Sequence, residues 1–185
     1  MIKILAAAMI FVFVSGFFCY KSIVENRALK PPKNPRVVIT KSARKLEFFD
    51  GGELLKTYKI ALGFAPAGGK ESDGDGKTPE GEFYIFTKNA NSKFYLSLGL
   101  SYPSIEDAAR GWQSEIISRN EYEAILEAIE NKQMPAQNTN LGGEIYIHGG
   151  GAKTDWTRGC VALSDEDMKE FFDAVSVGTM VKIEP

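Results

Sequence analysis

The segment Ile145–Asp167, IYIHGGGAKTDWTRGCVALSDED, constrains the fold more than any other stretch of the chain. Its first four residues are β-branched or aromatic up to His148 and are bounded by glycines, which predicts the end of a short buried strand. Ser164 is followed by three carboxylates, which predicts a helix N-cap and an acidic first turn. A loop rich in glycine therefore joins a strand to a helix, and Cys160 lies on a tight turn facing back toward the strand.

The same segment holds the only histidine of the 185-residue chain and one of its two cysteines. A thiol becomes a good nucleophile when a base removes its proton, and a nearby imidazole can do so. The alternative is an inert buried cysteine beside a loop histidine. The flanking glycines favour a reactive pair, because they let backbone N–H groups approach a developing oxyanion. We expect Cys160 to be the nucleophile and His148 the base, with N–H groups of Gly159, Cys160 and the loop at Gly149 holding the oxyanion.

Two motifs in this segment resemble a known family. His148-Gly149, a loop, and then Thr157–Val161 (TRGCV) are similar to the catalytic motif of the L,D-transpeptidase (YkuD-type) domain. The stretches GKTPEG (76–81) and GTMVKI (178–183) are similar to the GxTPxG segment and the closing strand of that family. The resemblance covers residues 36–185 and implies a mostly β domain with flanking helices (α+β), a YkuD-type β-sandwich or barrel-like fold.

The chain departs from the family pattern at two positions. Arg158 stands where many members have a second histidine, and Ala162 stands where many have an arginine. The permanent charge of Arg158 is expected to lower the pKa of the neighbouring thiol. The resemblance further implies that Arg158 and Thr157 contact the substrate, and that Ser101 and Tyr102, at the end of FYLSLGLSYP, line its groove.

The resemblance implies acyl transfer on peptidoglycan stem peptides through a Cys160 thioester. Two alternatives stay open: hydrolysis of L,D cross-links or of peptidoglycan–lipoprotein links, which would make such a lipoprotein a partner, and a non-catalytic wall-binding module. Sortases need an arginine after the cysteine, and residues 161–185 contain none. NlpC/P60 amidases place cysteine before histidine, which is the reverse of this chain.

Composition adds exclusions. One histidine and one domain cysteine cannot supply the ligands of a zinc site. The sequence also lacks a glycine-rich phosphate-binding loop that follows a strand and opens a helix. We therefore expect no metal and no cofactor. The formal charge of −2 and the pI of about 5.6 give no reason to expect a nucleic-acid partner. The near match of residues 71–82 to a calcium loop lacks the two flanking helices, which argues against calcium.

The N-terminus predicts export. Residues 4–20 form an uncharged apolar run after Lys3, typical of an export signal or a short membrane anchor. We assign residues 1–24 to this segment, 25–35 to a Pro-rich linker and 36–185 to the catalytic domain. The domain is then expected in the periplasm or cell envelope, tethered to the inner membrane unless the segment is cleaved.

Secondary structure follows from pattern and turn residues. Strands are predicted at 36–40, 45–49, 54–60, 83–87 and 94–100, with a hairpin turn at 50–52. Helices are predicted at 105–110, 120–131 and 165–175. The apolar face of the second helix is expected to serve packing. Trp156 is either a lid over the cleft or a plug beneath the loop, and the sequence leaves that choice open.

Overall fold

The computed structural model describes residues 29–185, so the proposed 1–24 segment and part of the linker lie outside the described residues. Among the residues it describes, no helix is both long and apolar enough to cross a membrane. The elements in chain order are β1 Pro35–Thr40, β2 Lys45–Asp50, β3 Glu53–Lys59, β4 Gly81–Ser92, β5 Tyr95–Leu100, α1 Ile105–Gln113, α2 Arg119–Glu130, β6 Tyr146–His148, β7 Val161–Ala162, α3 Asp165–Ala174 and β8 Met180–Glu184.

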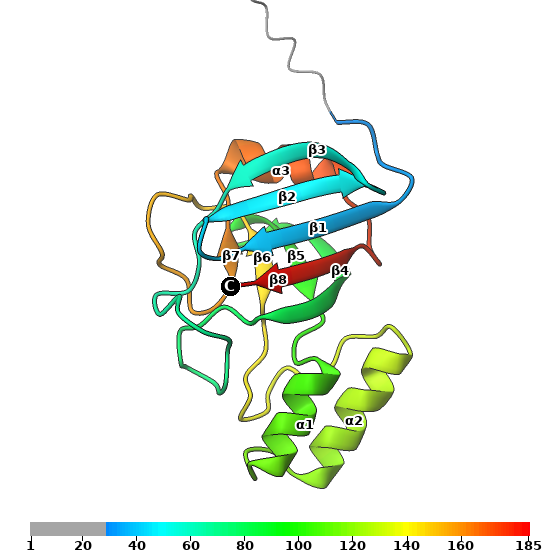
Figure 1. The fold of residues 1–185 in the computed structure, drawn as a ribbon, viewed down its shortest axis with the longest axis vertical. Coiled ribbons are helices and arrows are strands. Elements are labelled where there is room, and N and C mark those ends of the chain that lie inside the picture. Colours follow the sequence, from blue (N-terminus) through cyan, green and yellow to red (C-terminus); the bar gives the residue numbers. More distant parts are fainter. Residues whose placement is uncertain (1–28) are drawn as a thin grey trace, which may run out of the picture.

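The eight strands form one curled sheet in the order β3-β2-β1-β8-β4-β5-β6-β7 (Figure 1). Most neighbours are antiparallel, but β1 pairs with β8 and β6 with β7 in parallel. The two ends of this order meet, because Ala61, just past β3, bridges to Ala162 of β7, and Gly63 bridges to Thr157. The expected mostly β, barrel-like fold is confirmed, and the bridges form a seam where the sheet closes on itself.

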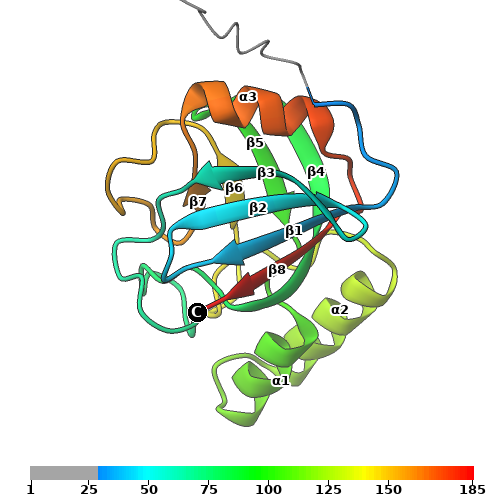
Figure 2. The same cartoon turned by 45° about the horizontal axis from the view of Figure 1, so that its top comes forward.

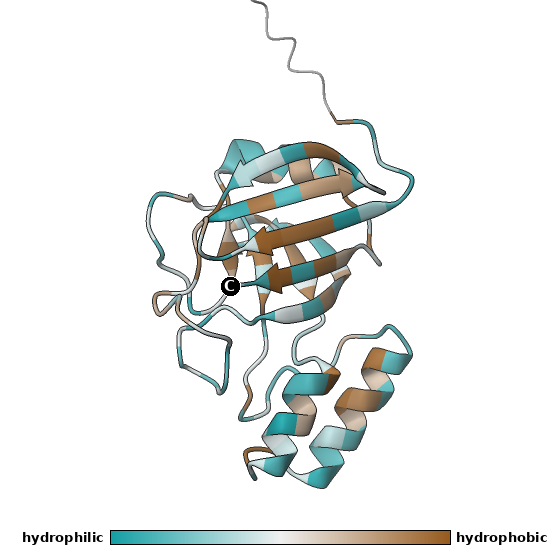
Figure 3. Ribbon diagram, viewed as in Figure 1, coloured by the Kyte–Doolittle hydropathy of each residue, from teal (hydrophilic) through white to brown (hydrophobic). Residues whose placement is uncertain are grey.

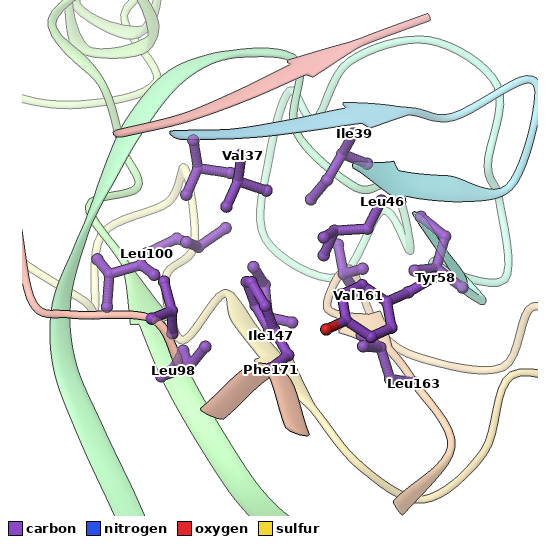
Figure 4. Packing of buried hydrophobic residues seen from close by; sticks show 14 of the residues in the cluster. Val37, Ile39, Leu46, Tyr58, Leu98, Leu100, Ile147, Val161, Leu163 and Phe171 are labelled. Carbon is purple, nitrogen blue, oxygen red and sulfur yellow. The ribbon is translucent and has the colours of Figure 1, made fainter. Parts of the chain in front are cut away.

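The interior of the curled sheet is the main core. Strands carry alternating bands of hydrophobic and hydrophilic residues (Figure 3), as period-2 patterning requires. The buried side chains converge from both halves of the sheet and from α3 (Figure 4). Phe171 of α3 is fully buried and meets Phe48 edge-on, with 5.2 Å between ring centroids. α3 therefore covers one opening of the curled sheet, as the turned view shows (Figure 2).

A helical hairpin, α1 and α2, projects from the opposite end of the sheet (Figure 1). Each helix begins with a capping box, formed by Ser104 with Asp107 and by Ser118 with Glu121. The hairpin has its own small core around Ile125, against which the other apolar residues of α2 pack. This confirms the expectation that the apolar face of α2 serves packing.

The predicted elements agree with the observed ones, and the differences lie mainly at their ends. Ser164 caps α3 as expected, with its side chain accepting a hydrogen bond from the backbone N–H of Asp167. The main exception is β4, which runs to Ser92 where the sequence predicts an end at Thr87. Residues 88–92 are mostly polar and give no strand signal, but they continue the strand by pairing with β5 through a register irregularity between Asn89 and Ser92.

Candidate active site

His148 and Cys160 lie on two neighbouring strands and on the same face of the sheet. The register pairs Ile147 with Val161 and His148 with Ala162, which places Cys160, one residue before β7, opposite Tyr146. Side chains alternate between faces along a strand, so Ile147 and Val161 point into the core while His148 and Cys160 point to the other face. The parallel pairing of these two short strands is what brings the two side chains together.

Both side chains line a pocket of about 700 Å³. One wall comes from the end of β4 and the start of β5, and the other comes from the motif loop before Cys160. The lining residues are Asn89, Asn91, Ser92, Lys93, Phe94, Ser97, Glu144, Tyr146, His148, Trp156, Thr157, Arg158 and Cys160.

The imidazole of His148 is held in one tautomer and one orientation. Its Nδ1 lies 2.6 Å from the carbonyl oxygen of Gly149, and because a carbonyl only accepts, Nδ1 carries the proton. The ring stacks on Phe94 with 4.7 Å between centroids and meets the edge of Trp156 at 5.6 Å. Nε2 is therefore the basic nitrogen, and the Gly149 carbonyl is the orienting group that the sequence could not name.

The thiol of Cys160 lies against the backbone of the strand opposite. Its Sγ accepts from the backbone N–H of Tyr146 and donates to the carbonyl of Glu144, both at 3.4 Å. Burial raises the pKa of the Cys160 thiol to about 11, and the Tyr146 N–H offsets only part of this. Burial likewise lowers the pKa of His148, with a partial offset from its bond to Gly149. At neutral pH the pair is a neutral thiol beside a neutral imidazole.

The expected effect of Arg158 on the thiol is not what the structure shows. Arg158 is exposed at the rim of the pocket, and the cations whose charge lowers the pKa of Cys160 are Lys70 and Lys93. Their effect is smaller than that of burial, so the thiol pKa is raised overall. A long side chain in water is screened from a sulfur that faces the protein backbone.

These features match a family of known enzymes. The family model for the L,D-transpeptidase catalytic domain (YkuD) matches residues 34–183. The chain belongs to this family. The matched range begins and ends within two residues of the 36–185 domain expected from the motifs.

The matched part of this L,D-transpeptidase chain spans about a third to a half of the length of the relatives described next. "Putative L,D-transpeptidase YafK" of Escherichia coli (strain K12) is 30% identical over 88 residues, which cover 44% of this chain and 35% of YafK. The solved structure of the helical cell shape determining protein Pgp2 from Campylobacter jejuni is 21% identical with a TM-score of 0.53, over 86% of this chain and 51% of Pgp2. Bd1075 of Bdellovibrio bacteriovorus is also 21% identical, with a TM-score of 0.52, over 85% and 51%. The two structures share the fold.

The backbone amides of Gly159 and Gly149, expected to hold an oxyanion in this L,D-transpeptidase domain, are already engaged. The N–H of Gly159 donates to Oγ1 of Thr157 at 3.2 Å, and the N–H of Gly149 donates to the carbonyl of Leu96 at 3.2 Å. Within residues 29–185 no acceptor lies in hydrogen-bonding geometry with the backbone N–H of Cys160. Of the three expected donors, only the N–H of Cys160 has no hydrogen-bond partner within residues 29–185.

Glycine at 149 has a different reason. A Cβ added there would lie 2.5 Å from Oδ1 of Asp165 and 3.0 Å from the carbonyl of Phe94. Asp165, the first residue of α3, also accepts the N–H of Gly150 at 2.8 Å. The glycine loop is therefore fastened to the start of α3, and Gly149 is needed for that close approach.

Ser101 and Tyr102 do not line the pocket, which corrects their expected role as substrate contacts. Ser101 is buried and accepts the backbone N–H of Tyr84 at 2.9 Å. Tyr102 is fully buried, and its hydroxyl donates to the carbonyl of Leu141 at 2.9 Å. An alternating aromatic and small pattern fits a strand facing a groove as well as one facing the core, so the sequence could not separate the two.

The two remaining predicted contacts, Thr157 and Arg158, do line the pocket. Thr157 is buried, and its hydroxyl donates to the carbonyl of Cys160 at 2.7 Å, so it supports the backbone at Cys160. Trp156 is 38% exposed and forms a wall above His148, which places it on the lid side of the choice left open by the sequence. Lys93 and Phe94 also line the pocket. Phe94 is the first residue of the FYLSLGLSYP stretch, but only the end of that stretch was expected to line the groove.

At the segment that resembles a calcium loop, Lys70 forms an ion pair with the carboxylate of Asp75. The carboxylate of Asp75 accepts from Nζ of Lys70 at 2.9 Å and from the backbone N–H groups of Glu71, Ser72 and Lys77. Burial would raise the pKa of Asp75, but these bonds outweigh it and lower the pKa. In the described part of the chain, no three His, Cys, Asp or Glu side chains group as metal ligands. The segment leads into β4 behind Gly159.

Proposed function

We propose that this protein is a cysteine acyltransferase that acts on peptidoglycan stem peptides, with Cys160 as nucleophile and His148 as base. The observation that carries this is the shared pocket face of the chain's only histidine and its one domain cysteine, with the imidazole fixed so that Nε2 is free to accept a proton. Membership of the L,D-transpeptidase family supports the substrate class: a stem peptide cleaved between an L-centre and the following D-residue.

In the acylation step, Sγ of Cys160 attacks the carbonyl carbon of the scissile amide and transfers its proton to Nε2 of His148. The oxyanion that forms accepts the backbone N–H of Cys160. When the C–N bond breaks, the proton moves from His148 to the departing amine, which leaves as the D-residue. The stem remains on the enzyme as a thioester.

In the second step an amine from another stem attacks the thioester. His148 takes the amine's proton and returns it to the sulfur as the C–S bond breaks, so the enzyme ends in its starting state. The neutral ground-state pair suits both steps, because His148 enters each one unprotonated. Hydrolysis of cross-links or lipoprotein links would differ only in that water takes the place of the amine.

Two cationic side chains in the pocket, Lys93 and Arg158, support transpeptidation over hydrolysis as the proposed reaction. Ala162, where many relatives have an arginine, is fully buried under the seam and presents nothing to substrate. Lys93 and Arg158 line the pocket instead and could pair with the carboxylates of a stem. We therefore place a transpeptidase first and a hydrolase second. The domain would act outside the cytoplasm, where its substrate lies.

The test uses purified protein and a disaccharide tetrapeptide. Cross-linked dimers and a thioester adduct on Cys160 by mass spectrometry are expected, and Cys160→Ala and His148→Ala should each lower turnover by several orders of magnitude. Full activity of Cys160→Ala would refute the mechanism. Release of lipoprotein or monomer from sacculi without dimers would favour the hydrolase, and no turnover of either kind would leave the wall-binding module.

A further inference from the structure

An ion pair outside the pocket joins two distant parts of the chain. Arg44, in the turn between β1 and β2, contacts Asp155 in the motif loop, 111 positions further on. Nη2 lies 2.7 Å from Oδ2, and Nε lies 3.0 and 3.2 Å from the two carboxylate oxygens. A planar fork that meets both oxygens fixes orientation as well as distance.

Asp155 also holds the backbone at the seam. Its Oδ1 accepts the N–H of Leu62 at 2.9 Å, while the carbonyl of Leu62 accepts the N–H groups of Trp156 and Thr157, both at 3.1 Å. Both backbone polar groups of Leu62 are therefore bonded to the motif loop: its N–H to the Asp155 carboxylate, and its carbonyl to the next two amides. Gly63, the next residue, has no room for a side chain, since an added Cβ would lie 2.0 Å from the carbonyl oxygen of Gly76 and 3.2 Å from the Cα of Gly159.

Trp156 and Thr157, whose N–H groups bond to Leu62, also contact His148 and Cys160. Trp156 meets His148 edge-on at 5.6 Å, and its Nε1 donates to the carbonyl of Gly151 at 3.0 Å. Thr157 donates its hydroxyl to the carbonyl of Cys160 at 2.7 Å. Any displacement of the segment at Asp155 is passed to both sides of the pocket through these contacts.

We propose that Arg44 and Asp155 are positioning residues: their ion pair clamps the motif loop to the seam and so sets Trp156 against His148 and Thr157 beneath Cys160. The reaction that this clamp serves is the proposed acyl transfer. Burial would raise the pKa of Asp155, but its bonds to Arg44 and Leu62 outweigh burial and lower it, so the carboxylate stays ionised and the clamp closed at neutral pH.

A matched pair lies on the next strand. Lys45 and Glu47 form an ion pair of 3.0 Å on β2, with side chains 38% and 20% exposed, against 35% and 21% for Arg44 and Asp155. Ion pairs this exposed contribute little to stability. The two pairs are alike in exposure, but only Asp155 belongs to the motif loop and also accepts the N–H of Leu62. A change in Glu47 therefore serves as the control for the loss of an equally exposed ion pair.

The test uses the full chain in a Trp112→Phe background, which leaves Trp156 as the only tryptophan. Acrylamide quenching of Trp156 should rise at least about twofold in Asp155→Ala, because a released segment gains solvent contact. In the same variant kcat for acyl transfer should fall about 10- to 100-fold with a much smaller change in KM, since misplaced reacting groups cost such factors. Arg44→Lys, which keeps the charge and loses the fork, should lie in between, and Glu47→Ala should match the parent.

The clamp is refuted if Asp155→Ala and Glu47→Ala give equal quenching, or if kcat falls while Trp156 stays as protected as in the parent. Circular dichroism checks folding, and if Asp155→Ala does not fold, Arg44→Lys decides by the same two readouts. If the parent protein shows no acyl transfer, the proposed function fails, but quenching still decides the clamp.

Discussion

The thiol of Cys160 should react slowly at neutral pH, in spite of its proposed role as nucleophile. Its pKa is raised from an ordinary 9.0 to about 11 because it is buried. Near pH 8 the thiolate fraction is then about one in a thousand instead of about one in ten. Alkylation by iodoacetamide should be about 100-fold slower than that of an ordinary thiol, since the thiolate is the reacting form.

The assay follows carbamidomethylation of the Cys160 peptide by mass spectrometry, which separates it from Cys19. The logarithm of the rate should climb with slope one from pH 6 to pH 10 without reaching a plateau. His148→Ala should leave the profile unchanged, because a neutral imidazole does not stabilise the thiolate by charge. A plateau at or below pH 8 that disappears in His148→Ala would refute the neutral pair and indicate a thiolate–imidazolium pair. Slow alkylation alone thus does not identify an inert cysteine.

Further predictions concern stability and the loop. Phe171→Ala should lower the free energy of unfolding in urea by about 3–5 kcal/mol, because it empties a fully buried site; a loss below 1 kcal/mol would contradict the packing. Thr157→Val removes the hydroxyl that holds the Cys160 carbonyl and should slow turnover about 10-fold in the muropeptide assay. Asp165→Ala should speed amide hydrogen exchange of residues 149–151 and leave β1 unchanged. Burial lowers the pKa of His148, so the imidazole binds its proton more tightly in the unfolded chain than in the folded one. The free energy of unfolding should therefore fall as the pH drops from about 6.5 through the folded pKa. His148→Gln should remove that pH dependence.

Local sequence predicted most of the fold because its signals are local. The turn at Gly51, the cap at Ser164 and the β-branched runs are each decided within a few residues. The pairing of strands was not predictable in this way: β8 lies between β1 and β4, far from both in sequence. Such pairing depends on which strand edges meet, and a single sequence does not encode that in any short window.

The same difference between local and long-range signals applies to the candidate site. The motif identified His148 and Cys160, since their residue types carry the chemistry. It could not identify Phe94, whose ring stacks on the imidazole from the turn between β4 and β5, or the Gly149 carbonyl, which any residue could supply. The sequence also could not show that the N–H groups of Gly159 and Gly149 already have hydrogen-bond partners, because those partners depend on the folded structure.

The place of β8 in the sheet decides when the site can exist. Residues 180–184 join β1 to β4, and the seam at Ala61 and Ala162 closes only when the sheet curls around them. These contacts join residues far apart in sequence. The entropy of closing the long loops between them is lost before the contacts stabilise the chain, so we expect them to form late in folding. A chain emerging from the ribosome or a translocation channel thus carries its cysteine before the candidate site is assembled. The proposed acyl transfer would begin only after residues 180–184 have emerged and joined the sheet.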